Sequence, residues 1–451
     1  MLIVHDLLLN KRGIAAPAKH PLRVAVEKHK ARLNAEFTRV RLRDGCENTQ
    51  ELRKHIEETL KVEVGGDDHW RPRWVRINTL KTSLQEQLHT TFKDHRQVDD
   101  LKELRASKDK VVFIDKHVPN LLALVGVDDL TKSTAYLDGL IIFQDKASCF
   151  PALLLDPASC DGDIVDACAA PGNKTTHIAS LVQGQRKTMI HACERDTTRV
   201  QSLLKLVNLA GAAKGCEIHP GQDFLRVDPN KSPWNTVSAV LLDPSCSGSG
   251  IIGRDETMRI VLPKTASSDT PKNGKSKKRK RLQVESEKKV TVAQQLKGQA
   301  DGDLVKALSD RLEALSQIQL KLLLHAFKFP SARRITYSTC SMYDDENEYV
   351  VMKALNSVIA KRRRWRILSQ DEQPDGLRAW PIRGKVEACE ATSGDRIPAA
   401  EVIAKSCIRC EKSTIEGTQG FFVAGFVRDA AGEEATLQLE EDVDEFNGFD
   451  N

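Results

Sequence analysis

The stretch that decides the fold runs from Asp163-Ile164-Val165 into Asp166-Ala167-Cys168-Ala169-Ala170-Pro171-Gly172-Asn173-Lys174-Thr175. An apolar run that ends in small residues and a glycine, with a helix pattern directly after it, is typical of a strand whose backbone turns closely around a ligand. This loop lacks the leading glycine of a phosphate-binding P-loop, and it lacks the G-x-G-x-x-G dinucleotide fingerprint. The stretch therefore predicts a strand, a ligand-binding turn and a helix that belong to neither of these two phosphate-binding motifs.

The segments on either side of this loop alternate between strand and helix patterns. Strands are predicted at 163–167, 188–193, 215–219, 237–242, 333–338 and 421–427, and helices at about 174–183, 196–210 and 303–328. Such alternation is the signature of a doubly wound, mostly parallel sheet. We therefore predict an α/β, Rossmann-like catalytic domain over residues 144–429.

A carboxylate at the end of the second predicted strand points to the ligand. Glu194 is placed to accept hydrogen bonds from ribose hydroxyls, as acidic residues do at this position in doubly wound folds. Together with the small-residue loop it predicts a cofactor that contains an adenosyl group. Because both common phosphate fingerprints are absent, S-adenosyl-L-methionine fits best.

The remaining segments differ in composition. Residues 1–65 predict a helical N-terminal segment; they begin inside an apolar run without a cap, as a truncated N-terminus would. Residues 70–142 predict a small α/β module whose basic strand Arg71–Asn78 carries Trp74. This strand is read equally well as an RNA-contacting strand or as a solvated charged strand. Residues 264–302 predict a disordered basic insertion, read as a nuclear-import signal, an RNA contact or a solvated loop, and 430–451 an acidic disordered tail.

Composition excludes several classes of protein. The chain has 451 residues, 40% of them hydrophobic and 29% charged, with a net charge of +5. No apolar stretch is long enough to cross a bilayer, and no secretory signal is present, so no membrane association is predicted. The 11 scattered cysteines are expected to be reduced thiols. Cys407 and Cys410 form a single C-x-x-C, and since a structural zinc site needs four ligands, no metal site is predicted.

Cys246 and Cys340 each follow an apolar run that predicts a buried strand. A thiol at the carboxyl end of a strand lies where α/β folds keep their active sites. Two such thiols predict a nucleophile and a helper. The alternative is two small apolar core residues, but the Asp, Ser and Gly residues around them favour exposed turns.

Four motifs occur in the order found in one enzyme family: Asp166–Thr175, Glu194 with Arg199, Asp243–Gly250 and Tyr337–Ser341. Weaker support comes from Gln144–Ser148, Gly420–Ala424 and Arg73–Lys81. The chain resembles the Fmu/Sun family of RNA cytosine-C5 methyltransferases, and within it the eukaryotic nucleolar branch that modifies large-subunit ribosomal RNA. The resemblance covers nearly the whole chain except the basic insertion and the acidic tail.

The resemblance implies roles for particular side chains. Cys340 would be the nucleophile that adds to C6 of the target cytosine, which is covalent catalysis by a thiolate. Cys246 would assist breakdown of the adduct, Asp243 would stabilise the cytosine at its N3 edge, and Lys174 would help to polarise the base. The implied cofactor-binding residues are Cys168, Ala169, Ala170, Pro171, Gly172, Asn173, Lys174, Glu194, Arg199, Asp223 and Asp243.

One departure from the family pattern leaves a rival assignment open. Most members have Pro-Cys where this chain has Ser245-Cys246, and DNA cytosine methyltransferases attack with the Pro-Cys thiol. The intact Thr339-Cys340 pair favours Cys340 as the nucleophile. The Ser form is itself typical of the nucleolar branch, and a DNA-type target-recognition domain is absent.

The resemblance also implies a setting. The expected partner is RNA, most simply large-subunit ribosomal RNA or a pre-ribosome, met by a monomer in the nucleus and nucleolus. The target base must be unpaired, looped or flipped out. The alternative function is a catalytically silent ribosome-assembly factor on the same fold, although such a homologue is expected to lose at least one of the two thiols, Asp243 or Lys174. Asp345, Glu346 and Glu348 are read only as suiting the N-terminus of a helix.

Overall fold

The computed structural model describes residues 2–10, 13–53, 55–56, 70–125, 130–184, 188–251, 306, 308–391, 400–412 and 414–428. The predicted insertion 264–302 and tail 430–451 lie outside these residues. The chain divides into two compact units, Met1–Trp70 and Arg71–Asn451. Among the described residues, none of the helices combines the length and the apolar character needed to cross a membrane.

The first unit is a small helical body. It contains α1 (Leu2–Leu9), α2 (Pro21–Glu27) and α3 (Lys30–Arg43), and residues 49–53 are also helical. Pro21 stands at the start of α2, where its missing N–H costs nothing. Nη1 of Arg23 donates to the carbonyl oxygen of Ala16 at 2.6 Å, which ties α2 to the loop before it.

The second unit begins with a five-stranded sheet in the order β2-β3-β4-β1-β5. Its strands are β1 (Arg73–Ile77), β2 (Arg96–Val98), β3 (Val111–Ile114), β4 (Leu121–Leu124) and β5 (Ile141–Phe143). β1 pairs antiparallel with both β4 and β5. Three short helices connect the strands: α5 (Leu84–His89), α6 (Leu101–Ala106) and α7 (Thr134–Leu137). Each is capped by a Ser or Asp side chain that accepts a backbone N–H, which satisfies a donor that the helix leaves free.

The larger sheet confirms the Rossmann-like prediction. Its strands are β6 (Asp163–Asp166), β7 (Ile190–Glu194), β8 (Cys216–Pro220), β9 (Val237–Leu242), β10 (Arg334–Thr339), β11 (Arg366–Ile367), β12 (Ile408–Cys410) and β13 (Phe421–Val427). They run in the order β11-β13-β10-β9-β6-β7-β8, with β12 paired to β13. The strands from β10 to β8 pair in parallel, while β13 is antiparallel to β10.

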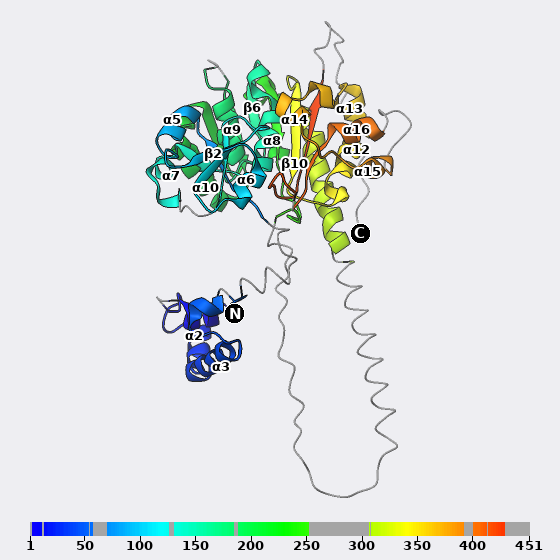
Figure 1. Cartoon of the computed structure of the whole chain (residues 1–451). Coiled ribbons are helices and arrows are strands. Elements are labelled where there is room, and N and C mark those ends of the chain that lie inside the picture. The colour runs from blue at the N-terminus through cyan, green and yellow to red at the C-terminus, as the bar shows by residue number, and fades with distance from the viewer. Residues whose placement is uncertain are drawn as a thin grey trace, which may run out of the picture. The chain divides into compact units, whose positions relative to one another are not determined.

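Helices cover both faces of this sheet, as a parallel sheet requires. The helices are α8 (Lys146–Leu155), α9 (Asn173–Leu181), α10 (Thr197–Ala210), a helix over 308–326, α12 (Glu348–Asn356), α13 (Val358–Arg362), α14 (Asp375–Arg378), α15 (Val386–Glu390) and α16 (Ala400–Ser406). One apolar core joins the strands to α8, α9 and α10, and a second joins them to helix 308–326, α12 and α16. In Figure 1, α9 and α10 lie on one side of β10, and α12, α15 and α16 lie on the other.

Candidate active site

The two predicted thiols meet at the carboxyl edge of the sheet. β9 and β10 are parallel neighbours, with Leu242 opposite Tyr337, so the loops after them leave the sheet side by side. The Sγ atoms of Cys246 and Cys340 lie 3.0 Å apart. Both side chains are partly exposed. The structure therefore brings together two residues that stand 94 positions apart in the chain.

A lysine–carboxylate pair stands at the same edge of the sheet: Asp243 follows β9, and Lys174 belongs to α9, which follows β6. Nζ of Lys174, at the start of α9, lies 2.8 Å from Oδ2 of Asp243 and donates to Oγ of Ser148 at 3.0 Å. Ser338, in β10, donates to the other oxygen of Asp243 at 2.6 Å. Nζ of Lys174 also lies 5.4 Å from the centre of the Phe421 ring, a cation–π distance. Hydrogen bonds thus fix both members of this pair.

The electrostatics favour a protonated lysine and a protonated Cys246. Burial alone would lower the pKa of Lys174, but the charge and the hydrogen bond of Asp243 outweigh it, so the pKa is raised. The pKa of Cys246 is raised strongly, first by its hydrogen bond to Cys340 and then by burial. At neutral pH Cys246 is therefore a thiol beside Cys340, and its S–H is available to the neighbouring sulfur.

A buried carboxylate supports the loop that carries Cys246. Glu346 is fully buried, and its Oε1 accepts from the Ser247 backbone N–H at 2.9 Å and from Nε2 of Gln319 at 2.9 Å. Gln319 also donates to the Ser245 carbonyl oxygen at 3.1 Å. The interpretation of Glu346 as a helix-dipole residue is therefore incomplete, because this side chain bonds to the backbone on one flank of Cys246. Nothing in the local sequence signals the contact, which spans 99 positions.

Two glycines allow the loops around Cys340 to touch. The Gly250 N–H donates to the Cys340 carbonyl oxygen at 2.8 Å, and the Gly420 N–H donates to the Gly250 carbonyl oxygen at 3.0 Å. A Cβ atom on Gly250 would lie 2.1 Å from the carbonyl oxygen of Gly420, so any side chain there would separate the two backbones. The position of Cys340 therefore depends on both glycines.

The loop after β6 closes over Glu194. The side chain of Glu194, at the end of β7, accepts from the backbone N–H of Ala170 at 3.3 Å and from that of Asp196 at 2.8 Å. Arg199 donates to the Ala170 carbonyl oxygen at 2.5 Å and lies 3.6 Å from Glu194. Each carboxylate oxygen can accept a second hydrogen bond, so Glu194 retains capacity for ribose hydroxyls.

The residues of this loop fit an adenosyl ligand. Gly172 has φ +111°, in the region that favours glycine, and it ends the turn that leads into α9. Ala169 and Ala170 add only methyl groups, so the backbone of the turn can approach a ligand. Asp223 follows β8 and accepts from the Leu225 N–H at 3.0 Å, which leaves its other oxygen for an amine donor. The loop after β6, Glu194 of β7 and Asp223 after β8 stand at the carboxyl ends of neighbouring parallel strands.

For two side chains of the basic strand near residue 74, the structure differs from both readings. Trp74 and Arg76, in β1, are buried. Nε1 of Trp74 donates to the Gly417 carbonyl oxygen at 2.9 Å, and Arg76 donates to Gln144 at 2.6 Å and to Thr176 at 2.9 Å. Burial lowers the pKa of Arg76 to about 10. These two side chains join the small sheet to the catalytic domain instead of facing RNA or solvent.

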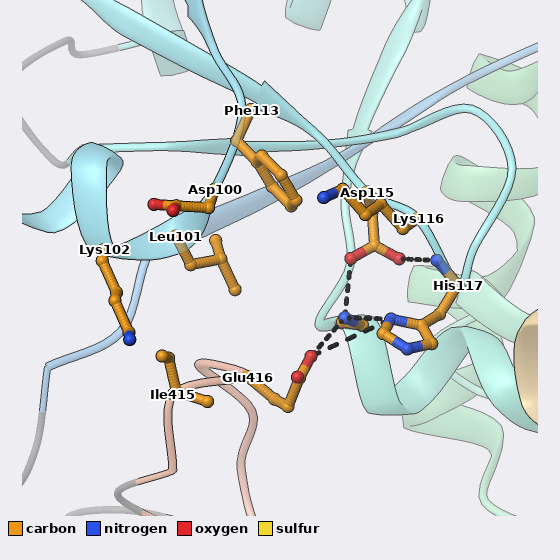
Figure 2. Close-up of a pocket in the computed structure, with 10 residues that line it drawn as sticks. Asp100, Leu101, Lys102, Phe113, Asp115, Lys116, His117, Ile415 and Glu416 are labelled. Atoms are coloured by element: carbon orange, nitrogen blue, oxygen red, sulfur yellow. Dashed lines mark hydrogen bonds and ion pairs between the residues drawn. The ribbon is translucent and has the colours of Figure 1, made fainter. Parts of the chain in front are cut away.

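A cavity of about 160 Å³ lies beside this junction. Figure 2 shows Asp115, His117 and Glu416 around one end of it. Nζ of Lys146 lies among them, 2.6 Å from Asp115, 3.0 Å from Glu416 and 3.1 Å from Nδ1 of His117. Because Lys146 starts α8 and Asp115 follows β3, this cluster ties the small sheet to the larger one.

Comparison with known proteins identifies both parts of the second unit. Residues 71–144 match the family model of the NOL1/NOP2/Sun domain family member 5 ferredoxin-like domain, and residues 152–272 match the model of the 16S rRNA methyltransferase RsmB/F. The chain is 36% identical to the 25S rRNA (cytosine-C(5))-methyltransferase rcm1 of Schizosaccharomyces pombe, over 94% of this chain and 75% of that protein. It is 33% identical to the 28S rRNA (cytosine-C(5))-methyltransferase of Mus musculus, over 94% of this chain and 76% of that protein. Among solved structures, a methyltransferase homologue from Pyrococcus horikoshii superposes with a TM-score of 0.52 at 20% sequence identity. The match covers 80% of this chain and 88% of the homologue, and it supports the assignment of the fold.

Proposed function

Because the chain belongs to the family of eukaryotic large-subunit rRNA (cytosine-C5)-methyltransferases, we propose that it forms 5-methylcytosine in large-subunit ribosomal RNA. The observation that carries the proposal is the pair of thiols, 3.0 Å apart, beside the Lys174–Asp243 ion pair. This set of groups matches what carbon methylation of an electron-poor ring requires, namely a nucleophile, a proton donor and charges for the base.

The proposed reaction begins with Cys340. Its sulfur adds to C6 of the cytosine, and the electrons of the C5=C6 bond move to C5 and the ring. S-adenosyl-L-methionine supplies the electrophilic methyl group that C5 then takes. Loss of the C5 proton restores the C5=C6 bond and expels the Cys340 thiolate. Atoms and charge balance, since the ring gains a methyl cation and passes its C5 proton to water, while S-adenosyl-L-homocysteine would leave as a neutral thioether.

The neighbouring groups have separate parts in this scheme. Cys246, held as a thiol, hydrogen-bonds to the Cys340 sulfur and assists its departure from C6. Asp243 and Lys174 bind the polar edge of the cytosine, where charge develops once C6 is attacked. Ser148 and Ser338 keep the pair oriented. Both thiols, Asp243 and Lys174 are present together, which favours an enzyme over a silent assembly factor.

The cofactor residues are assigned on their position. Cys168 to Lys174 would line the methionine portion, Glu194 with Arg199 would hold the ribose, and Asp223 would meet the adenine amine. Burial raises the pKa of Cys168 strongly, so this thiol stays protonated and is not a second nucleophile. Asp243, which follows β9 and pairs with Lys174 of this loop at 2.8 Å, would contact both base and cofactor.

The substrate and the setting extend this proposal. The target cytosine must leave its stack to reach Cys340, so an unpaired or flipped base is expected. The exposed Arg73 of β1 and the basic residues of the small module would contact phosphates, which makes binding weaken as salt rises. A monomer in the nucleus and nucleolus agrees with an rRNA substrate, and fluorescence microscopy of the tagged chain tests the location.

The test is methyl transfer from radiolabelled S-adenosyl-L-methionine to unmodified large-subunit rRNA, followed by identification of the product nucleoside. We expect label in 5-methylcytosine with the wild-type protein and none with Cys340→Ala. Label in another nucleoside would contradict the proposal. No label, on RNA presented both free and within pre-ribosomes and with cofactor binding verified, would favour the silent assembly factor.

A further inference from the structure

A second cluster of chemically reactive side chains lies at the far edge of the larger sheet, on strands β7 and β8. It consists of His191, Glu217 and His219, whose ligand atoms all lie within 4.8 Å of one another. Nδ1 of His191 is 3.1 Å from Nε2 of His219 and 3.5 Å from Oε2 of Glu217. The proposed methyl transfer uses none of these groups.

The sheet itself creates this arrangement. β8 is the edge strand and runs parallel to β7, with His191 opposite Glu217 in the register. Residues two apart on a strand share a face, so Glu217 and His219 present their side chains to the same side as His191. The pairing of the two strands thus holds three residues of the metal-ligating type together without an ion.

The distances suit a transition metal. Two ligand atoms that each lie about 2.1 Å from a tetrahedral ion are about 3.4 Å apart. The separations from Nδ1 of His191 to His219 and to Glu217, 3.1 and 3.5 Å, fall on either side of that value. Two imidazoles and one carboxylate are a ligand set that favours Zn²⁺ or a similar divalent ion over Mg²⁺ or Ca²⁺.

An outer carboxylate supports the same reading. Nε2 of His191 is buried and lies 3.6 Å from Oδ2 of Asp163, just beyond hydrogen-bond distance. Asp163 is itself fixed, because it accepts from the Met189 N–H at 2.9 Å and from Thr236 at 3.0 Å. A carboxylate behind the second nitrogen of a histidine is the usual support for a metal ligand, since it keeps the proton on that nitrogen.

Access and enclosure differ on the two sides of the cluster. The Glu217 side chain is 56% exposed, whereas that of His191 is 2% exposed, so an ion can enter from solvent toward a buried ligand. The Trp234 ring covers the histidines, with ring centres 5.2 Å from His191 and 4.9 Å from His219.

We propose that His191, Glu217 and His219 bind one divalent transition-metal ion, such as Zn²⁺, with water at the remaining position. The ion links the edge strand β8 to β7. β7 ends in Glu194, and β8 leads to Asp223, so the ion would steady the two strands that carry these residues. The site is independent of the methyl-transfer proposal, because it stands on its own residues and distances.

The test uses Trp234 as a local probe in the full-length protein. Co²⁺ bound beside this ring is expected to quench its fluorescence. Zn²⁺ is expected to displace Co²⁺ and restore the fluorescence. Glu217→Gln, an exposed change that spares the fold, should weaken Co²⁺ binding at least 10-fold, and His219→Gln should weaken it further. Asp163→Asn, which leaves all three ligands in place and changes the carboxylate behind His191, should weaken Co²⁺ binding about 10-fold.

Two controls separate this site from the thiols and from surface histidines. His89→Gln, an exposed histidine on α5, should leave the Co²⁺ titration unchanged. The titration is repeated with Cys246 and Cys340 both replaced by serine, which removes the other plausible metal ligands. Quenching that persists unchanged in Glu217→Gln and His219→Gln, or its absence in the wild-type protein, would overturn the proposal in favour of a hydrogen-bonded histidine pair.

Discussion

Two lysine–aspartate pairs in the second unit differ in their exposure to solvent. Their lysines, Lys146 and Lys174, lie at the start of the neighbouring helices α8 and α9. Lys174 and Asp243 are 2.8 Å apart, with side chains 12% and 27% exposed, beside two thiols. Lys146 and Asp115 are 2.6 Å apart, and each side chain is 1% exposed. Nζ of Lys146 lies 5.3 and 5.0 Å from the ring centres of Trp74 and Trp380.

The difference shows that the identity of an ion pair does not determine its role. The Lys146–Asp115 pair lines a cavity, but both side chains are almost fully buried, and Nζ of Lys146 is held by Asp115 and Glu416, so this lysine serves to hold elements together. A partly open pair at the carboxyl edge of a parallel sheet can meet a ligand, and its charges remain available for chemistry. We therefore propose that Lys174 acts in catalysis and that Lys146 joins the two sheets.

The largest effect on the free energy of unfolding is expected for the Lys146–Asp115 pair. Lys146→Met leaves the buried carboxylate of Asp115 without its cation, which should lower the free energy of unfolding by about 3–5 kcal/mol. Urea denaturation of the purified chain measures it. The matched control is Lys174→Met, which should lose less stability because Lys174 and Asp243 are partly exposed to water; a larger loss in that variant would reverse the two assignments.

The buried carboxylate of Asp166 sharpens the comparison, because it hydrogen-bonds to a hydroxyl and pairs with neither lysine. Burial raises the pKa of Asp166 to about 6, and Thr175 donates to it at 2.7 Å. The native state therefore binds this proton more readily than the unfolded chain, whose pKa is 3.8. Stability should fall by up to about 3 kcal/mol as the pH rises from about 4 to 6, and level off above.

Asp166→Asn should remove this pH dependence, because an amide does not titrate. In urea denaturation, the free energy of unfolding of the variant minus that of the wild type should increase between pH 4 and pH 6. A difference that stays constant with pH would show that Asp166 is ionised in the native protein over this whole pH range.

The open pair should affect rate more than folding. Lys174→Met removes a charge that acts where the cytosine becomes polarised, so we expect methyl transfer to fall about 100-fold, a barrier increase of about 3 kcal/mol. Single-turnover methylation of rRNA measures it. In the same assay Lys146→Met, studied at a temperature where it is folded, should retain its rate; equal losses in both variants would contradict the assignment.

The smallest effect is expected at the support of the Cys246 loop. Glu346→Gln keeps the shape of the side chain but places an amide where the Ser247 N–H and Gln319 donate, which should cost about 1–3 kcal/mol of stability. Thermal unfolding measures the loss. Unchanged thermal unfolding together with an unchanged methylation rate would show that Glu346 does not hold the loop.

Much of this architecture is predictable from sequence because its signals are local. The strand 237–242 and the strand 421–427 coincide with β9 and β13, since both are continuous apolar runs with clear ends. The turn at Gly172 and the Thr339-Cys340 pair are likewise local patterns. Both lie at the carboxyl edge of the sheet, because β6, β9 and β10 follow one another in parallel.

The parts that sequence did not predict depend on contacts between distant segments. Residues 121–124 form β4, but four apolar residues in a row do not distinguish a strand from other buried structure. The burial of Arg76 requires Gln144 and Thr176, which are 68 and 100 positions away. His191 and His219 are separated by 28 positions and meet only through the pairing of β7 with β8.

The central claim, that Cys340 attacks and Cys246 releases, is tested most directly by trapping RNA on the protein. Cys246→Ala and Cys340→Ala are each incubated with S-adenosyl-L-methionine and substrate rRNA and then run on a denaturing gel. We predict an RNA–protein adduct that survives denaturation with Cys246→Ala, and none with Cys340→Ala. An adduct with Cys340→Ala and none with Cys246→Ala would contradict the account and make Cys246 the nucleophile.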